Sequence, residues 1–432
     1  MSNQLQEDYD FQERDVSAGH PVSGDLNKVR LVPRITVQAF CETEIVSQTI
    51  EMTANDRRMA RAKVKVLSGG LASAVEYFQP APTPNLTIIE SSLAGEELMT
   101  GLGRLAEVCD MDTKVIVIGH RNDIQIYREL VANGVSDYLV APLSMADLMS
   151  AISDIFIDPE QGPLGRVMAF IGAKGGVGSS TICHNVAWTI SSRYRNDVIL
   201  SDFDLAFGTA NINLDQDPPQ GIAEAVYSPD RMDDILLDRL LAKCADHLNL
   251  LAAPSTLDRT YDFTQDAFNN IIEVAQKSSP VVIVDLPHQW TAWTRQVLSL
   301  ADEIVITATP ELANLRNAKN LIDKLAELRP NDAKPKLVMN QVGVPKRPEI
   351  SVADFVKPLD IQPAAIIPFD PAIFGMASNN GQMIAEADPK SQIGQSFEFI
   401  AQLVTGKAEL KVEKKGGLGL LSKLKLGKKK SA

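Results

Sequence analysis

The sequence predicts an α/β protein made of two doubly wound domains, each built on a parallel β-sheet. Short apolar segments of strand length recur along the chain, and amphipathic segments of helix length separate them. The apolar segments of the second half are continuous rather than alternating, which is typical of parallel strands covered on both faces. A chain of 432 residues has room for about two or three such domains.

The first domain is expected at residues 33–157 and is predicted to contain five strands. These are ITVQAFC from Ile35, KVKVLSG from Lys63, NLTIIES from Asn85, KVIVIGH from Lys114 and SDYLVAP from Ser136. Helical patterns lie between them, for example at 94–110 and 123–135. Residues 1–32 are polar and aperiodic, which predicts a flexible N-terminal segment.

The second domain is expected at residues 166–405, after a Pro- and Gly-rich linker at 158–165. Its predicted strands begin at Val167, Asp197, His247, Pro280, Asp302, Pro335 and Pro363. A helix over 391–404 is expected to close this domain. Residues 406–432 form a low-complexity tail of lysine, leucine and glycine that is too short to have a core of its own.

Charge and cysteine content exclude several classes of protein. The net charge is −13, and nine lysines against two glutamates from residue 407 onward leave about −20 on the rest. So acidic a body disfavours binding to nucleic acid. The four scattered cysteines form no CxxC pair, no apolar run approaches ~20 residues, and the acidic N-terminus is unlike a signal peptide. We therefore expect a soluble, cytoplasmic protein.

A glycine-rich loop, GAKGGVGSST, follows the strand that begins at Val167 and opens the next helix. Backbone N–H groups of such a loop, together with a helix N-terminus, bind phosphate. The spacing resembles that of the P-loop G-x-x-x-x-G-K-[ST], but Ser179 stands in place of the lysine and Ser180 in place of the Mg²⁺-binding hydroxyl residue. The alternative is an accidental glycine turn. The predicted phosphate-binding residues are Gly175, Gly176, Val177, Gly178, Ser179, Ser180 and Thr181.

Carboxylates follow two other strands of the same predicted sheet. Asp202 and Asp204 end the strand from Asp197, and Asp285 ends the strand from Pro280. Open α/β sheets bind ligands at the carboxyl ends of their strands, so these features in order along one sheet indicate a site there. Each aspartate alone is also typical of a residue that caps a helix or a turn.

The segment KGGVGSST resembles the deviant P-loop of the MinD/ParA family, and the resemblance extends over residues 165–405. It implies ATP and Mg²⁺ as ligands and Lys174 as a lysine that reaches the partner's phosphates in a homodimer that encloses two nucleotides. The alternative for Lys174 is a solvated surface residue. The resemblance further implies these roles: Asp202 and Asp204 as the switch that holds water and Mg²⁺, Asp285 as the Walker B carboxylate, and Asn340 as the adenine-reading residue.

The absence of the P-loop lysine bears on catalysis. Backbone amides still hold phosphates, but the positive charge on the β- and γ-phosphate oxygens is missing. Lys174 and Asp204 are the candidate catalytic residues, while Ser180, Asp202 and Asp285 are the candidate Mg²⁺ ligands. We expect ATP binding weaker than in a complete P-loop, and hydrolysis that is slow or negligible.

The first domain resembles a response-regulator receiver that has lost its phosphotransfer residues. Glu90 takes the place of the phosphate-accepting aspartate, Gly119 that of the switch hydroxyl residue, and Ala141 that of the lysine. A glutamate there can mimic a phosphorylated aspartate, but a surface residue at a strand end is the more common case. Because phosphotransfer needs the missing groups, we expect a docking or dimerisation module.

The tail contains a basic, leucine-rich segment, GGLGLLSKLKLGKKKSA, at 416–432. Its leucines fall on one broad side of a helix, which predicts a short interfacial helix that binds anionic membrane surfaces through its lysines. MinD proteins have a comparable terminal anchor. The alternative, which the glycines favour, is a disordered solubilising tail.

A degenerate receiver followed by a MinD-like domain resembles the CpaE/TadZ family of Tad (Flp) pilus assembly proteins, which serve type II/IV secretion machinery. The resemblance implies a localisation factor at the inner membrane that marks an assembly site, such as a cell pole. It implies, as partners, the pilus secretion ATPase and inner-membrane platform proteins.

Other functions are also considered, and the sequence favours some of them more than others. A cycling MinD/ParA-type positioning ATPase requires turnover, and a nucleotide-free scaffold requires none. A reductase of the nitrogenase iron-protein type needs two cluster-binding cysteines, but only Cys183 and Cys244 lie in the second domain. A tyrosine kinase of this fold usually has a C-terminal tyrosine cluster, whereas the last tyrosine here is Tyr261.

Overall fold

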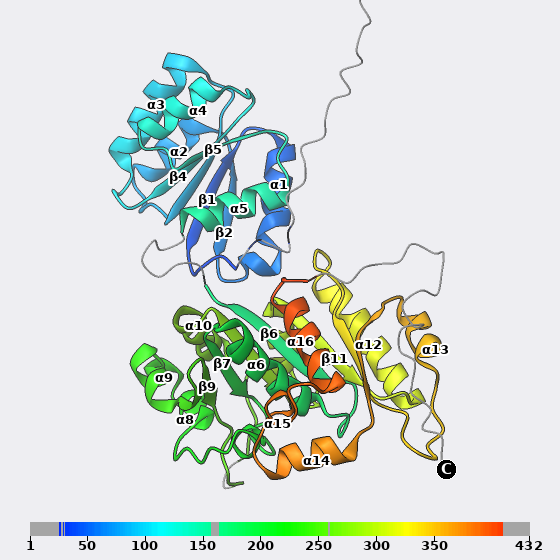
Figure 1. The fold of residues 1–432 in the computed structure, drawn as a ribbon. Coiled ribbons are helices and arrows are strands. Elements are labelled where there is room, and N and C mark those ends of the chain that lie inside the picture. Colours follow the sequence, from blue (N-terminus) through cyan, green and yellow to red (C-terminus); the bar gives the residue numbers. More distant parts are fainter. Residues whose placement is uncertain (1–25, 27–28, 30, 157–163, 258–259, 409–432) are drawn as a thin grey trace, which may run out of the picture. The chain divides into compact units, whose positions relative to one another are not determined.

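The computed structural model describes residues 26, 29, 31–156, 164–257 and 260–408 of the chain (Figure 1). The chain divides between Ile157 and Asp158 into two compact units, and each unit is described separately. Within the described residues, no helix has both the length and the apolar character that crossing a bilayer requires.

The first unit is a five-stranded parallel sheet with helices on both faces. Its strands are β1 (Thr36–Cys41), β2 (Lys63–Ser68), β3 (Leu86–Glu90), β4 (Lys114–Gly119) and β5 (Asp137–Val140), in the order β2-β1-β3-β4-β5. Its helices are α1 (Glu44–Ala54), α2 (Leu71–Phe78), α3 (Gly95–Val108), α4 (Ile124–Ala132) and α5 (Met145–Ile155). This strand order is the flavodoxin-like variant of the doubly wound fold.

Two hydrophobic clusters hold this sheet between its helices. Val46 of α1 and Leu148 of α5 pack on one face, and Leu98 of α3 and Leu130 of α4 pack on the other. β3 lies in the middle of the sheet and is buried along its whole length. The residue that ends β3, Glu90, is therefore buried as well.

The second unit is an eight-stranded sheet in the order β13-β12-β11-β6-β10-β7-β9-β8. Its strands are β6 (Arg166–Gly172), β7 (Val198–Asp202), β8 (Ala242–Ala245), β9 (Leu248–Leu251), β10 (Val281–Leu286), β11 (Glu303–Ala308), β12 (Lys336–Val342) and β13 (Pro363–Pro368). All pairs are parallel except β8 with β9. β6 lies between β11 and β10, in the centre of the sheet.

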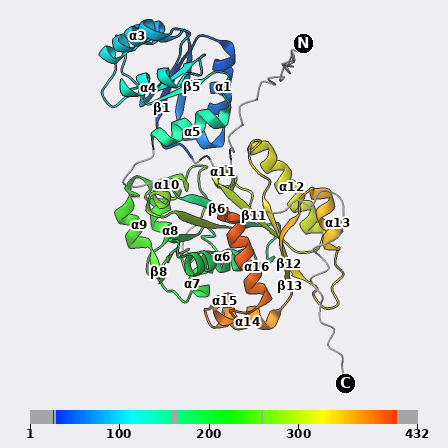
Figure 2. The same cartoon turned by 45° about the horizontal axis from the view of Figure 1, so that its top comes forward.

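Helices cover both faces of the second sheet (Figures 1 and 2). One face is covered by α6 (Ser179–Tyr194) and α16 (Gln392–Val404), and the other by α10 (Asn269–Ser278), α11 (Ala292–Leu300) and α12 (Leu312–Leu328). Alternate residues of β6 pack into the hydrophobic clusters on the two faces of the sheet. Val167 and Ile171 face the α10–α12 side, and Met168 and Phe170 face α6. Burial on both faces explains why these strands are continuously apolar.

Shorter helices complete the unit around the carboxyl ends and edges of the strands. They are α7 (Ala210–Asn213), α8 (Ile222–Tyr227), α9 (Asp234–Leu240), α13 (Val352–Val356), α14 (Pro371–Asn379) and α15 (Ile384–Ala387). The segment after β13 forms α14 and α15 before the predicted closing helix α16.

The predicted α/β fold with two doubly wound sheets is confirmed, and each of the twelve predicted strands is present within three residues of its expected bounds. The second sheet has one further strand that was not predicted, β8, which pairs antiparallel with β9 at the edge. β8 is four residues long and alternates between half-buried and exposed positions. Such a short edge strand, interrupted by Lys243, lacks the long apolar run by which the others were recognised.

Candidate functional site

The glycine-rich loop joins β6 to α6 at the carboxyl edge of the sheet. Gly176 and Gly178 have φ angles of 78° and 85°, a conformation that glycine adopts at no steric cost. Gly178 is the N-cap of α6, and among the described side chains none caps the first turn. The N–H groups of this turn are therefore free to bind an anion, as the sequence predicts.

Residues of β12 hold the loop in this shape. Asn340 donates from Nδ2 to the carbonyl of Val177 at 2.8 Å, and Gln341 donates from Nε2 to the carbonyl of Gly176 at 3.1 Å. A Cβ atom at Gly178 would lie 2.5 Å from Nδ2 of Asn340, so the close approach itself requires glycine. Side chains from outside the loop thus help to hold its shape, so that the loop is preorganised.

The base of the loop has two further supports. His288 donates from Nδ1 to the carbonyl of Gly172 at 2.8 Å, and Asn317 of α12 donates from Nδ2 to the carbonyl of Ala173 at 2.8 Å. Because these side chains come from after β10 and from α12, the loop is tied to elements on both sides of β6. None of these supporting residues was identified from the sequence.

Asn340, predicted to read adenine, lies against the loop and is buried. Its Nδ2 is used by Val177, while its Oδ1 has no hydrogen-bond partner. The amide oxygen is the part of this side chain that is left to accept a hydrogen bond.

Lys174 lies at the start of the loop with half of its side chain exposed. Its Nζ is 3.3 Å from Oε2 of Glu311, the N-cap residue of α12. Nη1 of Arg347 lies 3.6 Å from the other oxygen of Glu311. An exposed ion pair of this kind contributes little free energy, on the order of 0–1 kcal/mol, so Lys174 can exchange it for another anion.

Ser179 and Ser180 occupy the first turn of α6, directly after Gly178. The hydroxyl oxygen of Ser179 is buried without a hydrogen-bond partner. Ser180 and Thr181 are half-buried. The position of the P-loop lysine is therefore occupied by a short, neutral side chain, and the first turn of α6 offers an anion its N–H groups and the helix dipole.

Asp202 and Asp285 end the neighbouring strands β7 and β10, and the structure places them with His184 of α6 in one buried cluster. The ligand atoms of the three side chains lie within 4.8 Å of one another. Burial, together with the nearby charge of Asp285, raises the pKa of Asp202 to about 7, an effect that His184 partly offsets. His184 was not recognised from the sequence, because a histidine inside a helix has no local signal of its own.

Asp202 also organises the loop that follows β7. Its Oδ1 accepts from the N–H of Asp204 and its Oδ2 from the N–H of Ala210, both at 3.1 Å. A Cβ atom at Gly208 would lie 2.4 Å from Oδ2, so the loop packs directly on this carboxylate. Asp204 accepts from the N–H of Phe207 at 3.1 Å, and burial raises its pKa. Both aspartates thus fix a turn, whatever else they bind.

The residues predicted to bind Mg²⁺ are compatible with the ion. Asp285 has a buried oxygen, Oδ1, with no hydrogen-bond partner, which is an atom a cation would engage. Carboxylate and hydroxyl oxygens are the ligands that Mg²⁺ prefers. Ser180, Asp202 and Asp285 would hold the ion, which supplies charge neutralisation at bound phosphates.

The carboxyl end of β3 in the first unit is arranged differently. Glu90 is buried, and its carboxylate accepts from the N–H groups of Glu42 and Thr43 at 2.7 and 2.8 Å. It also accepts from the hydroxyl of Thr43 at 2.6 Å, and Nε2 of His120 lies 3.3 Å away. The expectation of a surface glutamate is wrong: Glu90 ties β3 to the N-terminus of α1.

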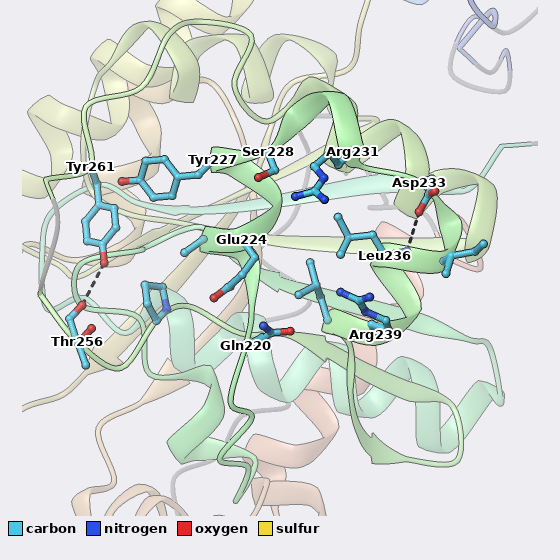
Figure 3. Close-up of a pocket in the computed structure, with 14 residues that line it drawn as sticks. Gln220, Glu224, Tyr227, Ser228, Arg231, Asp233, Leu236, Arg239, Thr256 and Tyr261 are labelled. Atoms are coloured by element: carbon cyan, nitrogen blue, oxygen red, sulfur yellow. Dashed lines mark hydrogen bonds between the residues drawn. The ribbon is translucent and has the colours of Figure 1, made fainter.

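A pocket of about 610 Å³ lies apart from the strand-end residues, between α8, α9 and the segment after β9 (Figure 3). Arg231 and Arg239 line it together with Glu224 and Tyr261. Within the described part of the chain, neither arginine forms an ion pair. None of the predicted site residues lines this pocket.

The predicted membrane-binding segment at 416–432 lies outside the described residues. The last described residues are Lys407 and Ala408, and Nζ of Lys407 lies 3.7 Å from the ring centroid of Tyr194 in α6. A lysine over an aromatic ring at this distance is a cation–π contact.

Several known proteins are similar to this chain. Residues 165–339 match a family model described as an AAA domain. The septum site-determining protein MinD of Synechocystis sp. is 27% identical over 252 residues, or 56% of this chain and 90% of that protein. MinD of Bacillus subtilis is 25% identical over 277 residues, or 61% of this chain and 97% of that protein.

Solved structures give a similar result. A ParA family ATPase from Chlorobium tepidum is 26% identical, with a TM-score of 0.51, over 55% of this chain and 99% of that one. The pilus assembly protein CpaE from Caulobacter crescentus is 44% identical, with a TM-score of 0.29, over 30% of this chain and 98% of that one. The matches to MinD and to the ParA family ATPase support a place for this chain in the MinD/ParA superfamily of P-loop ATPases.

Proposed function

We propose that this protein is a pilus assembly and localisation factor of the CpaE/TadZ type, which binds ATP in a MinD-like homodimer and recruits secretion machinery at the assembly site. The observation that carries the proposal is the preorganised P-loop with Ser179 in the position of the lysine. Such a loop keeps the backbone N–H groups that bind phosphate. It lacks the lysine charge that stabilises phosphoryl transfer.

The homodimer rests on Lys174. Among the residues that the structure describes, its Nζ pairs with the partly exposed Glu311 at 3.3 Å, and half of its own side chain is exposed, so it is accessible to a second chain. Breaking an exposed pair costs little, whereas a phosphate of a nucleotide held by the partner offers a stronger, charge-assisted hydrogen bond. ATP therefore serves as the link between two chains.

Slow or negligible turnover follows from the groups around the nucleotide site. Ser179 supplies no charge, and Asp202 and Asp204 are already engaged by backbone N–H groups. The product of ATP binding is then a long-lived dimer surface, which partners recognise. The MinD relatives are named for septum-site determination, and a positioning role of the same kind is what we propose here.

Recruitment is assigned to the first unit. Its strand ends hold Glu90 and His120 instead of a phosphorylatable aspartate, so it presents one fixed surface rather than a switchable one. We propose that this surface docks the pilus secretion ATPase or the inner-membrane platform. Acetyl phosphate should add no phosphate to this unit, and labelling of the full chain with acetyl phosphate would contradict the assignment.

Membrane association is assigned to residues 416–432. Their leucines and lysines predict binding to anionic lipid, with about 1 kcal/mol from each lysine near the surface. Deleting residues 416–432 should release the protein from anionic liposomes in a flotation assay and leave ATP binding unchanged. Persistent flotation of the truncated protein would assign the anchor elsewhere.

One set of measurements on purified full-length protein tests the proposal. Equilibrium ATP binding, steady-state hydrolysis and molar mass by light scattering are recorded on the same preparation. The proposal predicts ATP binding, a shift to the dimer mass and little turnover. Turnover that Lys174→Ala and Asp204→Ala both abolish would indicate a cycling positioning ATPase, and no ATP binding would indicate a nucleotide-free scaffold.

A further inference from the structure

Three metal-ligating side chains meet beneath the glycine-rich loop. His184 comes from α6, Asp202 from the end of β7 and Asp285 from β10, and all three are buried. Their ligand atoms lie within 4.8 Å of one another. Ligands that each lie about 2.0–2.2 Å from one ion are separated by up to about 4 Å, so a small closure brings all three into range.

Two atoms of this cluster have no hydrogen-bond partner. Nε2 of His184 lies 3.2 Å from Oδ2 of Asp285 but makes no hydrogen bond with it. Oδ1 of Asp285 is likewise without a partner. Because buried polar atoms in native proteins are nearly always paired, a nitrogen and an oxygen that are unpaired in the same cluster indicate a missing ligand.

The charge of the cluster indicates a cation. Two carboxyl groups meet in this buried cluster, and burying ionised carboxylates without a counter-ion is costly. Among the residues that the structure describes, neither aspartate forms an ion pair with a lysine or an arginine. A divalent cation would cancel the charge of both carboxylates.

The surroundings of His184 suit a metal ligand. Nδ1 of its ring lies 3.0 Å from the side-chain amide of Asn213 in α7. The nitrogen and oxygen of an amide are interchangeable in this geometry, so a turned amide accepts a hydrogen bond from Nδ1–H. Metal-binding histidines usually donate their second ring N–H in this way, which leaves Nε2 free for the ion.

We propose that His184, Asp202 and Asp285 form a binding site for a divalent transition-metal ion of the Mn²⁺ or Zn²⁺ class, which is occupied without nucleotide. An imidazole nitrogen favours such ions over Mg²⁺, which prefers oxygen ligands only. The site shares two aspartates with the proposed nucleotide site but does not depend on ATP binding. An ion there joins α6, β7 and β10, and so fixes the carboxyl edge of the sheet.

Mn²⁺ is the probe of choice because the four cysteines would compete for Zn²⁺. Full-length protein is stripped with a chelator, titrated with Mn²⁺ without nucleotide, and free Mn²⁺ is measured by electron paramagnetic resonance. The wild type should bind about one ion per chain, and His184→Gln should bind at least ~10-fold more weakly. His247→Gln is the matched control, since it removes a partly exposed histidine that pairs with Asp197 at 2.8 Å.

Circular dichroism checks that each variant is folded. A second variant tests the site without changing any of the three metal ligands. Asn213→Ala leaves the three ligands in place and should weaken Mn²⁺ binding about 10- to 100-fold, the usual effect of removing a partner of a metal-binding histidine. No Mn²⁺ binding by the wild type, equal binding by a folded His184→Gln, or displacement by equimolar Mg²⁺ would overturn the proposal. Mn²⁺ binding by protein that binds no ATP would support it and contradict only the nucleotide site.

Discussion

The two sheets share one architecture but treat the carboxyl ends of their central strands in opposite ways. In the first unit, Glu90 at the end of β3 is fully paired with the N-terminus of α1. In the second, the loop after β6 keeps free N–H groups, and Asp285 at the end of β10 keeps an unpaired oxygen. The comparison shows that a doubly wound sheet provides the location of a site, while unpaired polar groups decide whether a ligand is needed there.

Removing Glu90 should produce the largest loss of stability. Glu90→Ala removes the acceptor of the part-buried hydrogen bonds from the N–H groups of Glu42 and Thr43, which we expect to cost about 3 kcal/mol of unfolding free energy of the first unit. Denaturant unfolding of the full chain measures this loss. Glu96→Gln, at an exposed position in α3, is the control and should change little. A loss below about 1 kcal/mol would show that Glu90 is not the tie we describe.

The pH dependence of stability should differ between wild type and Asp202→Asn in the presence of a chelator. Because the pKa of Asp202 is raised from 3.8 to about 7 in the folded state, the folded protein holds a proton that the unfolded chain releases. The wild type therefore loses stability as pH rises from about 4 to about 7, by roughly 1.4 kcal/mol per pH unit.

Asp202→Asn has no such proton, so its unfolding free energy relative to the wild type should rise by on the order of 2 kcal/mol between pH 5 and pH 8. The comparison between two pH values removes the cost of the lost hydrogen bonds, which is the same at both. Parallel pH profiles for the two proteins would show that Asp202 ionises normally in the folded state.

Adding a side chain at Gly178 should disrupt the shape of the phosphate-binding loop without unfolding the domain. Gly178→Ala adds a Cβ atom 2.5 Å from Nδ2 of Asn340, at a residue with a φ of 85°. We expect ATP affinity to fall by at least ~100-fold, or about 2.7 kcal/mol, in calorimetric titration. Gly375→Ala, in open space within α14, is the control. Undiminished ATP affinity in Gly178→Ala would place the nucleotide elsewhere.

Restoring the missing lysine should have the smallest effect on binding. Ser179→Lys returns a positive charge to the first turn of α6, and a charge-assisted bond of about 1.4 kcal/mol corresponds to ~10-fold tighter ATP binding. If turnover rises as well, the missing lysine is what holds hydrolysis back. A variant with neither gain would show that the loop no longer positions phosphates.

Much of this fold could be predicted from the sequence, because parallel strands buried on both faces are continuously apolar and glycines mark the loop after β6. The edge strand β8 could not, since four alternating residues carry no apolar run. The burial of Glu90 and the position of His184 depend on contacts with segments 47 and about 100 residues away, which periodicity does not report. The supports from Asn317 and Gln341 were missed for the same reason.

The most direct test of the central claim is the molar mass of the protein with ATP, measured by light scattering for wild type, Lys174→Ala and Lys243→Ala. Lys243 is an exposed lysine with a single weak ion pair, at 3.8 Å, and controls for the loss of one charge. The proposal predicts that ATP shifts the wild type and Lys243→Ala to the dimer mass, while Lys174→Ala stays monomeric. A dimer of Lys174→Ala that forms as readily as the wild type would contradict the proposal.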